Sequence, residues 1–224
     1  MSLHAGAATA EITPPVGVEL AGFVAREQPS IGIHDPLFAR ALYLENEGEQ
    51  ILWINADLIA FKRSAVRQLS AILSDEFNIP ATNIIFSATH THSGPPTIPL
   101  HFCGELHEEF RSYMRSFERS VCEASRNAWR GAEPVTLYGG QATCALAVDR
   151  RGKASAHTDH VLGALGFKSG TGKLVAVLAN YPIHPVVLGH ENRLISGDLL
   201  GEAARQIEES CRTVALFTNG ACGN

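Results

Sequence analysis

The stretch from Ile84 to Pro96 constrains the fold of this chain more than any other part of the sequence. It opens with the apolar, β-branched run Ile84–Phe86, which is typical of a buried strand, and Ser93–Pro96 ends that strand abruptly because Gly and Pro favour a loop. His90 and His92 lie where the strand gives way to the loop. Proteins that mix helices and strands place much of their chemistry at such strand ends.

His90 and His92 have the spacing of two side chains that share a face. In an extended segment, residues i and i+2 project to the same side, so both imidazoles can enter one cavity. One can then serve as a metal ligand and the other as a proton carrier. The alternative is that both are ordinary hydrogen-bonded histidines at the end of a strand.

His184 repeats this arrangement in the second half of the chain. Leu174–Asn180 is an apolar run typical of a buried strand, and Pro185 favours extended geometry at His184, directly before it. Asp198 follows at the expected start of a helix, where a carboxylate suits the helix dipole. Two strand-end histidines and one carboxylate would supply three protein ligands and leave a position for water, which is the pattern of catalytic zinc.

The remaining sequence predicts more strands than helices. The expected strands are Ala8–Thr13, Leu37–Leu44, Ile51–Ala56, Asn83–Thr89, Val135–Ala147, Val161–Phe167, Leu174–Asn180 and Val214–Thr218. The expected helices are Lys62–Phe77, Glu105–Arg130 and Gly197–Cys211. Because both hairpins and crossovers occur, we expect a mixed α/β fold of the α+β kind, with mixed β-sheets covered by helices, rather than a doubly wound Rossmann fold.

Composition limits the possible partners and the cellular setting. The 224 residues are 45% hydrophobic, enough for one substantial core, and no shift in composition divides residues 1–224, so we expect a single domain. The net charge is −5 without a basic cluster, which disfavours nucleic acid and anionic membranes as partners and favours a small-molecule or lipid substrate. We find no signal peptide and no apolar run of membrane-spanning length, so we expect a soluble protein without an integral membrane segment.

The cysteines point to a reducing compartment. There are five of them, an odd number, and none forms a Cys-x-x-Cys pair. Reduced thiols in the cytoplasm fit this pattern better than a disulfide scaffold does. A secreted protein whose signal peptide had been removed would look the same.

Several short motifs occur in the same order as in one known family, and together they span essentially the whole chain. The motifs are Glu11–Gly17 (Glu-Ile-Thr-Pro-Pro-x-Gly), Gly32–Leu42, Ala88–Pro95 (Ala-Thr-His-Thr-His-Ser-Gly-Pro), His184–Pro185 and Ile195–Asp198. The octet around His90 is the most specific of them. On these motifs the sequence resembles the neutral/alkaline non-lysosomal ceramidases.

This resemblance implies a zinc-dependent amidase. It places His90 and His184 as zinc ligands and His92 beside the metal, on the second histidine of the motif. Arg150 resembles the arginine of an Asn-Arg pair in the family and would hold a substrate oxygen, although a solvated charge is the alternative.

Members of that family also carry functional residues later in their sequences. A Glu and a Tyr complete their zinc site, and a serine lies in a Gly-Asp-x-Ser segment. The nearest counterpart here is Gly220–Asn224, with Asn224 where the family has Asp. We therefore expect residues 1–224 to form a ceramidase-like domain that lacks its C-terminal part.

The leading hypothesis from the sequence is a Zn²⁺-dependent hydrolase that cleaves the amide C–N bond of an N-acyl compound. His92 would carry the proton to the leaving amine. Asp57 and Asp198 would orient the ligating imidazoles without binding the metal themselves. One alternative is a non-catalytic metal-binding or interaction domain of the same fold. Another is a hydrolase that acts on esters or on a sugar-linked amide.

Overall fold

The computed structural model describes residues 2–98, 108–149 and 158–223 and confirms a mixed α/β fold. The strands of the described residues are β1 (Leu3–Glu11), β2 (Gly32–Ile33), β3 (Phe38–Asn46), β4 (Glu49–Ala56), β5 (Ile84–Ala88), β6 (Glu133–Thr143), β7 (Val161–Ser169), β8 (Leu174–Tyr181), β9 (Leu194–Ile195) and β10 (Val214–Asn219). The helices are α1 (Arg63–Phe77), the short 3₁₀ turn η1 (Ala81–Asn83), α2 (Glu108–Arg130) and α3 (Asp198–Cys211).

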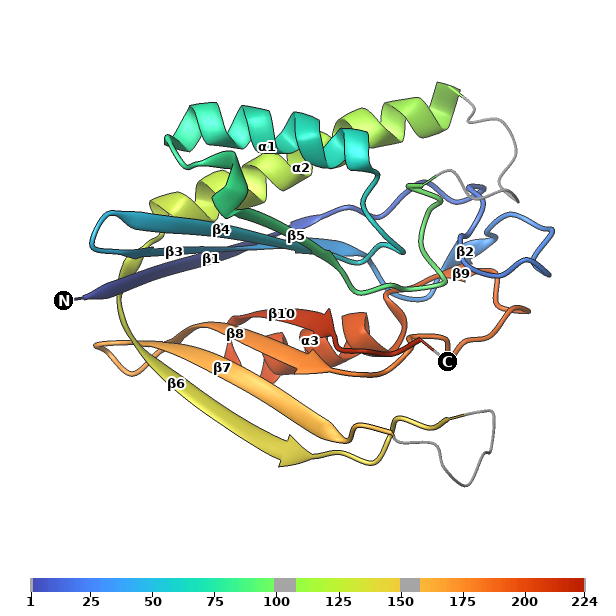
Figure 1. Cartoon of the computed structure of the whole chain (residues 1–224). Coiled ribbons are helices and arrows are strands. Elements are labelled where there is room, and N and C mark those ends of the chain that lie inside the picture. Colours follow the sequence, from blue (N-terminus) through green and yellow to red (C-terminus); the bar gives the residue numbers. More distant parts are fainter. Residues whose placement is uncertain (1, 99–107, 150–157, 224) are drawn as a thin grey trace.

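Eight of these strands form one mixed sheet that is folded into two facing halves (Figure 1). The strand order is β10-β8-β7-β6-β1-β3-β4-β5, and β1 joins the halves by pairing with both β3 and β6. Helices α1 and α2 cover the outer face of the half that contains β3, β4 and β5, and α3 packs against β10 in the other half. The molecule therefore has helices outside and two sheet layers inside.

Strand β3 shows how the sequence produces these layers. Because side chains alternate across a strand, Leu42 and Leu44 point to one face while Ala41 and Tyr43 point to the other. Leu42 lies in the cluster between the sheet halves with Phe167 and Leu216, whereas Ala41 and Tyr43 belong to the core beneath the helices. Both faces are buried, which explains why this strand is almost continuously apolar. Each fully buried leucine contributes about 1.5–3 kcal/mol to stability.

The strand directions place the predicted histidines at one end of the molecule. Strand β5 pairs in parallel with β4, and β8 pairs in parallel with β10. His90 lies just beyond the carboxyl end of β5, and His184 lies just beyond that of β8. Because the two halves face each other, these two strand ends come together at one edge of the layers.

Two differences from the sequence expectations concern short or marginal elements. Strand β1 begins at Leu3 rather than at Ala8, because its Ala- and Gly-rich first half pairs with β3 and with β6. Strands β2 and β9 form a separate two-stranded parallel sheet. Each has two residues, too few to show any alternation of apolar and polar side chains.

In the parts of the chain that the structure describes, no helix is both long and apolar enough to cross a bilayer.

Candidate metal centre

Three imidazoles, those of His90, His92 and His184, form the candidate site. One ring nitrogen from each lies within 4.8 Å of the others, and the Nε2 atoms of His92 and His184 are 3.0 Å apart. The ring centroids are 4.9–5.1 Å apart, with each pair of rings in an edge-on arrangement. The structure thus brings together the three histidines that the sequence singled out, although about ninety residues separate His184 from the other two.

His90 owes its position to a turn of the backbone rather than to an extended strand. Strand β5 ends at Ala88, and the main-chain N–H of His90 still donates to the carbonyl of Leu58, at 2.9 Å. The φ angle of His90 is 65°, in the left-handed region, so the expected extended i, i+2 geometry is wrong here. The side chains nevertheless converge because this turn redirects the chain. A left-handed non-glycine residue costs about 1–3 kcal/mol, and such strain clusters at functional sites.

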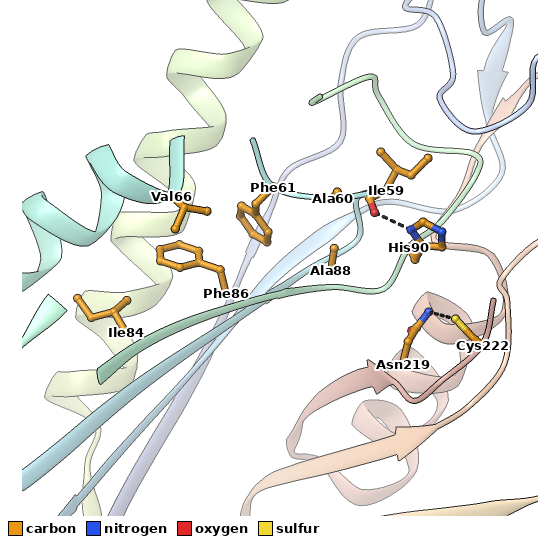
Figure 2. A pocket seen from close by; sticks show the side chains of 10 residues that line it. All are labelled: Ile59, Ala60, Phe61, Val66, Ile84, Phe86, Ala88, His90, Asn219 and Cys222. Atoms are coloured by element: carbon orange, nitrogen blue, oxygen red, sulfur yellow. Dashed lines mark hydrogen bonds between the residues drawn. The ribbon is translucent and has the colours of Figure 1, made fainter. Parts of the chain in front are cut away.

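The second nitrogens of His90 and His184 are next to main-chain carbonyls. Nδ1 of His90 is 2.8 Å from the carbonyl oxygen of Ile59 (Figure 2), and Nδ1 of His184 is 3.3 Å from that of Cys222. A carbonyl only accepts, so in each pair Nδ1 carries the proton and the lone pair is on Nε2, which in His184 lies 3.0 Å from Nε2 of His92. A metal ligand needs this tautomer, since the lone pair on Nε2 binds the metal. The carbonyl partner of Nδ1 fixes the tautomer.

His92 is held by a loop that the sequence analysis did not connect to the site. Gly22 has a φ of 102°, and a Cβ atom there would lie only 2.3 Å from Cγ of the His92 ring. The ring of Phe23 meets the His92 ring edge-on at 5.0 Å, and Arg26 donates a 2.6 Å hydrogen bond to the His92 carbonyl. Gly22 itself is the sign in the sequence of such a tight approach, because glycine is favoured where a backbone comes close to another group.

The surroundings of His92 keep its imidazole neutral. Burial, the largest cause, together with positive charge on His90, His184 and Arg26, lowers the pKa of His92 to about 4. A neutral imidazole is the form that binds metals and accepts protons.

Asp57 is hydrogen bonded away from the imidazoles. It accepts hydrogen bonds from the side chain of Arg40 and from the main chain of Phe38, both at 2.9 Å. Burial acts against the charge of Arg40, but the carboxylates of Asp57 and Glu208 outweigh it and raise the Arg40 pKa. Among the described residues, the hydrogen bonds of Asp57 do not reach a histidine ring. Carbonyl groups take the orienting place that the sequence analysis gave to this carboxylate.

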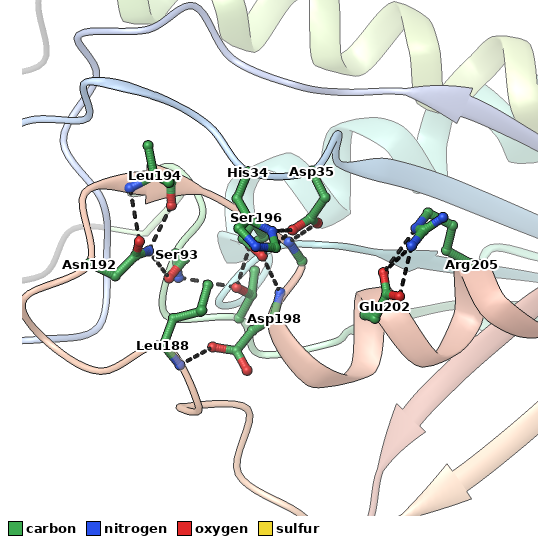
Figure 3. Close-up of polar contacts among 12 residues, drawn as sticks. His34, Asp35, Ser93, Leu188, Asn192, Leu194, Ser196, Asp198, Glu202 and Arg205 are labelled. Atoms are coloured by element: carbon green, nitrogen blue, oxygen red, sulfur yellow. Dashed lines mark hydrogen bonds and ion pairs between the residues drawn. The ribbon is translucent and has the colours of Figure 1, made fainter.

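Asp198 is hydrogen bonded to the main chain of the segment that follows His184. Its two carboxylate oxygens accept the N–H groups of Val187 and Leu188, each at 3.2 Å, just after His184. Figure 3 shows the bond to Leu188. It lies in the first turn of α3 as expected, with an unexpected left-handed φ of 52°. In the part of the chain that the structure describes, the hydrogen bonds of its carboxylate also end on main-chain groups rather than on an imidazole. Its influence on the site is therefore indirect.

The segment that carries His92 is tied to the start of the same helix. The hydroxyl of Thr91 donates to the carbonyl of Ser196 at 2.7 Å, and the N–H of Ser196 donates to the carbonyl of Ser93 at 3.0 Å (Figure 3). Thr91, Ser93 and Ser196 are all buried. One turn at the beginning of α3 thus holds both His92 and the loop after His184.

Three cavities meet at the histidine cluster. An apolar groove of about 540 Å³ runs along β5 and ends at His90, a second cavity of about 500 Å³ lies between the Gly22–Gln28 loop and His92, and a third of about 510 Å³ borders His184. The groove is lined mainly by Phe61, Val66, Ile84, Phe86 and Ala88 (Figure 2). His90 lines the first two cavities and His92 the last two, so the imidazoles are accessible from several sides.

The donor set fits a metal ion. Zinc binds imidazole nitrogens at about 2.0–2.1 Å, so two nitrogens on one tetrahedral ion lie about 3.3 Å apart. The 3.0 Å between the Nε2 atoms of His92 and His184 is close to that spacing. Imidazole ligands suit zinc as well as copper, iron and nickel.

The predicted role of Arg150 concerns a residue outside the described parts of the chain, as does the replacement at Asn224. The four cysteines that the structure describes are free thiols: Cys122, Cys144, Cys211 and Cys222.

Comparison with known proteins agrees with the motifs. Residues 3–131 match the model of the family described as neutral/alkaline non-lysosomal ceramidase, N-terminal. The neutral ceramidase of Drosophila melanogaster is 25% identical over 230 residues, which are 91% of this chain and 32% of that protein. The neutral ceramidase of Pseudomonas aeruginosa is 25% identical over 245 residues, which are 98% of this chain and 36% of that protein.

Solved structures show the same fold. The crystal structure of the Pseudomonas aeruginosa neutral ceramidase has a TM-score of 0.83 at 23% identity, covering all of this chain and 39% of that one. A ceramidase complexed with C2 has a TM-score of 0.85 at 23% identity and covers 38% of that chain. This chain therefore spans about a third of the length of the proteins it matches. Because the family model covers more than half of its residues, the chain belongs to the neutral/alkaline non-lysosomal ceramidase family.

Proposed function

We propose that this chain carries the metal-binding part of a zinc-dependent hydrolase that cleaves the amide C–N bond of an N-acyl compound. The observation that supports this most is the cluster of His90, His92 and His184, with one nitrogen from each within 4.8 Å of the others. Membership in the ceramidase family supports the same reaction class.

We propose His90 and His184 as zinc ligands and His92 as the proton carrier. Carbonyl partners at Nδ1 prepare the first two rings to donate Nε2 lone pairs. His92 lies beside them, and its lowered pKa keeps the imidazole neutral, the form that can accept a proton. When bound, zinc supplies a Lewis acid that polarises an amide carbonyl and lowers the pKa of water. The same geometry allows His92 to serve as a third ligand. Zinc binding by variants of His92 distinguishes this role from that of a proton carrier.

The substrate we propose is an N-acylated lipid of the ceramide type. The groove along β5 supports this choice, because it is lined by Phe61, Phe86 and Ile84 and ends at His90. A hydrocarbon chain in this groove would place an attached amide group near the imidazoles. Each methylene removed from water contributes about 0.8 kcal/mol, so a groove of this kind favours long chains over short ones.

Metal analysis combined with a matched pair of substrates tests the proposal. We expect purified protein to bind zinc and to hydrolyse a fluorogenic N-acyl sphingoid amide faster than the ester with the same acyl chain. Treatment with a chelator should remove the activity, and added Zn²⁺ should restore it. Amide hydrolysis that continues unchanged after complete removal of metal would contradict the proposal.

A further inference from the structure

Arg26 lies in the loop between β1 and β2, beside the histidine cluster, and its guanidinium is surrounded by main-chain carbonyls. It donates to His92 at 2.6 Å, to Gly189 at 3.1 Å and to His190 at 3.3 Å. Within its own loop it donates to Leu20 at 3.4 Å and Ala21 at 3.3 Å. Arginine has five N–H groups in a rigid fork, and this geometry uses the fork to span several acceptors at once.

These bonds join three segments that are distant in the sequence. The first is the loop that carries Gly22 and Phe23 against the His92 ring, and the second is His92 itself. The third is the loop at Gly189 and His190, five residues beyond His184. Arg26 therefore links the surroundings of His92 with the loop that follows His184.

The ring of Phe23 contacts both the guanidinium of Arg26 and the imidazole of His92. The central carbon of the Arg26 guanidinium is 5.0 Å from the centroid of the Phe23 ring, a cation–π distance, and the same ring meets His92 edge-on at 5.0 Å. Arg26 thus contacts His92 through its main-chain oxygen and supports the aromatic ring that packs against its side chain. Displacing the guanidinium would remove both the hydrogen bond to the His92 carbonyl and the cation–π contact with Phe23.

We propose that Arg26 is a positioning residue of the metal centre, which holds the loop after the proposed zinc ligand His184 in register with the main chain of His92. This inference rests on the proposed metal binding by the three histidines. Partners that orient metal ligands typically change metal affinity or activity 10–100-fold when they are mutated. Arg26 acts through the main-chain carbonyls of His92, Gly189 and His190 and takes no direct part in the chemistry.

Arg26→Lys tests the proposal, because lysine keeps the charge and loses the fork. Arg193→Lys is the matched control: Arg193 joins the same two loops by a 2.9 Å bond to the carbonyl of Pro29 and does not contact His92. Zinc dissociation constants are measured by competition with a chelating dye, and thermal unfolding is measured without metal. We expect Arg26→Lys to weaken zinc binding about tenfold or more, because it releases the loop that follows the proposed ligand His184. Arg193→Lys should stay within about twofold, because a peripheral contact leaves the ligands in place.

The absorption spectrum of bound Co²⁺ adds a readout that a general loss of stability would not move. We expect the visible bands to change in Arg26→Lys and not in Arg193→Lys, since these bands report ligand geometry. Wild-type affinity and an unchanged spectrum in Arg26→Lys would overturn the inference while leaving the proposed function intact. Absence of zinc binding by the wild-type protein at its three histidines would overturn both.

A second variant covers the case in which Arg26→Lys does not fold. Arg26→Ala leaves a space that a free guanidinium ion can enter, so this variant is prepared and assayed with millimolar guanidinium. Recovery of zinc affinity with guanidinium, and not with the same concentration of sodium chloride, supports the inference. Equal affinity in the two salts overturns it.

Discussion

At the scale of single residues, the candidate metal centre depends on backbone conformations that are costly on their own. His90 and Asp198 both have φ angles above 50° although neither is glycine. Each costs about 1–3 kcal/mol, so the surrounding contacts must hold it in place. His90 is held by its bond to the carbonyl of Leu58, and Asp198 by the N–H groups of Val187 and Leu188. The strain thus lies at the proposed ligand His90 and at Asp198, which holds the loop after the proposed ligand His184.

Removing single imidazoles tests the division of roles among the three histidines. We expect His90→Ala and His184→Ala each to abolish tight zinc binding, because each removes a ligand whose tautomer is fixed by a carbonyl. His92→Ala should retain zinc and lose most turnover, about 10²–10⁴-fold, as expected for loss of a proton carrier. Metal content and hydrolysis rates are measured side by side, with His4→Ala on β1 as control. Loss of zinc from His92→Ala as complete as that from His90→Ala would instead make His92 a ligand.

Gly22 offers a matched test of the close approach to His92. An added methyl group would lie 2.3 Å from the His92 ring, whereas at Gly17, with nearly the same φ, it would meet nothing within 4 Å. We expect Gly22→Ala and Gly17→Ala to share a backbone penalty of about 1–3 kcal/mol. Only Gly22→Ala should also lower the rate of hydrolysis, by about tenfold or more, because it displaces the ring of the proposed proton carrier. Chemical unfolding and hydrolysis rates of both variants check this, and equal rates would show that the ring can move aside without consequence.

At the scale of elements, the start of α3 organises the site. Asp198 accepts the N–H groups of Val187 and Leu188, and Ser196 is hydrogen bonded to Thr91 and Ser93. A helix start offers a natural place for a buried carboxylate, since the dipole there favours negative charge. The turn before α3 therefore links the loops on both sides of the histidine cluster.

Asp198→Asn is expected to loosen the loop after His184 without breaking the helix. Asparagine tolerates the left-handed conformation, so the change removes mainly the negative charge and one acceptor oxygen. We expect the free energy of unfolding to fall by about 1–2 kcal/mol and zinc binding to weaken by about tenfold. Urea unfolding and zinc titration measure both, with the exposed Asp75→Asn on α1 as control. A variant that lost stability but kept full zinc affinity would show that this loop does not set the position of His184.

The sequence predicted these elements where a long periodic pattern was present. Strands such as β4 and β8 and helix α1 follow their apolar patterns closely, and His90 and His184 were correctly placed at strand ends. The loop around Gly22 and Arg26 was not linked to the site, because its contacts join residues more than sixty positions apart. Asp57 was expected beside an imidazole, but its partner Arg40 lies on a neighbouring strand, and register across strands is not visible in one sequence.

At the scale of the whole molecule, a buried ion network crosses from one half of the sheet to the other. Arg40 on β3 is 1% exposed and binds Asp57, after β4, at 2.9 Å and Glu208 on α3 at 2.8 Å. Glu208 also accepts the N–H of Ala215 on β10 at 3.2 Å. Because the two halves also present His90 and His184, this network helps to fix the distance between the strand ends that form the site.

Replacing Arg40 by methionine tests how strongly this network holds the halves together. Methionine fills similar apolar space but leaves the carboxylates of Asp57 and Glu208 without their cation. Breaking a buried pair by removing one partner costs about 3–5 kcal/mol, so we expect a loss of that size in the free energy of unfolding measured with urea. Arg205→Met on α3 is the control, because its pairs with Glu202 and Glu209 are largely exposed and screened by solvent, so they should contribute little.

The triple variant Arg40→Met, Asp57→Asn, Glu208→Gln should recover part of the loss, since no unpaired charge then remains buried. Equal losses from Arg40→Met and Arg205→Met would mean that apolar packing between the sheet halves holds them together without the network.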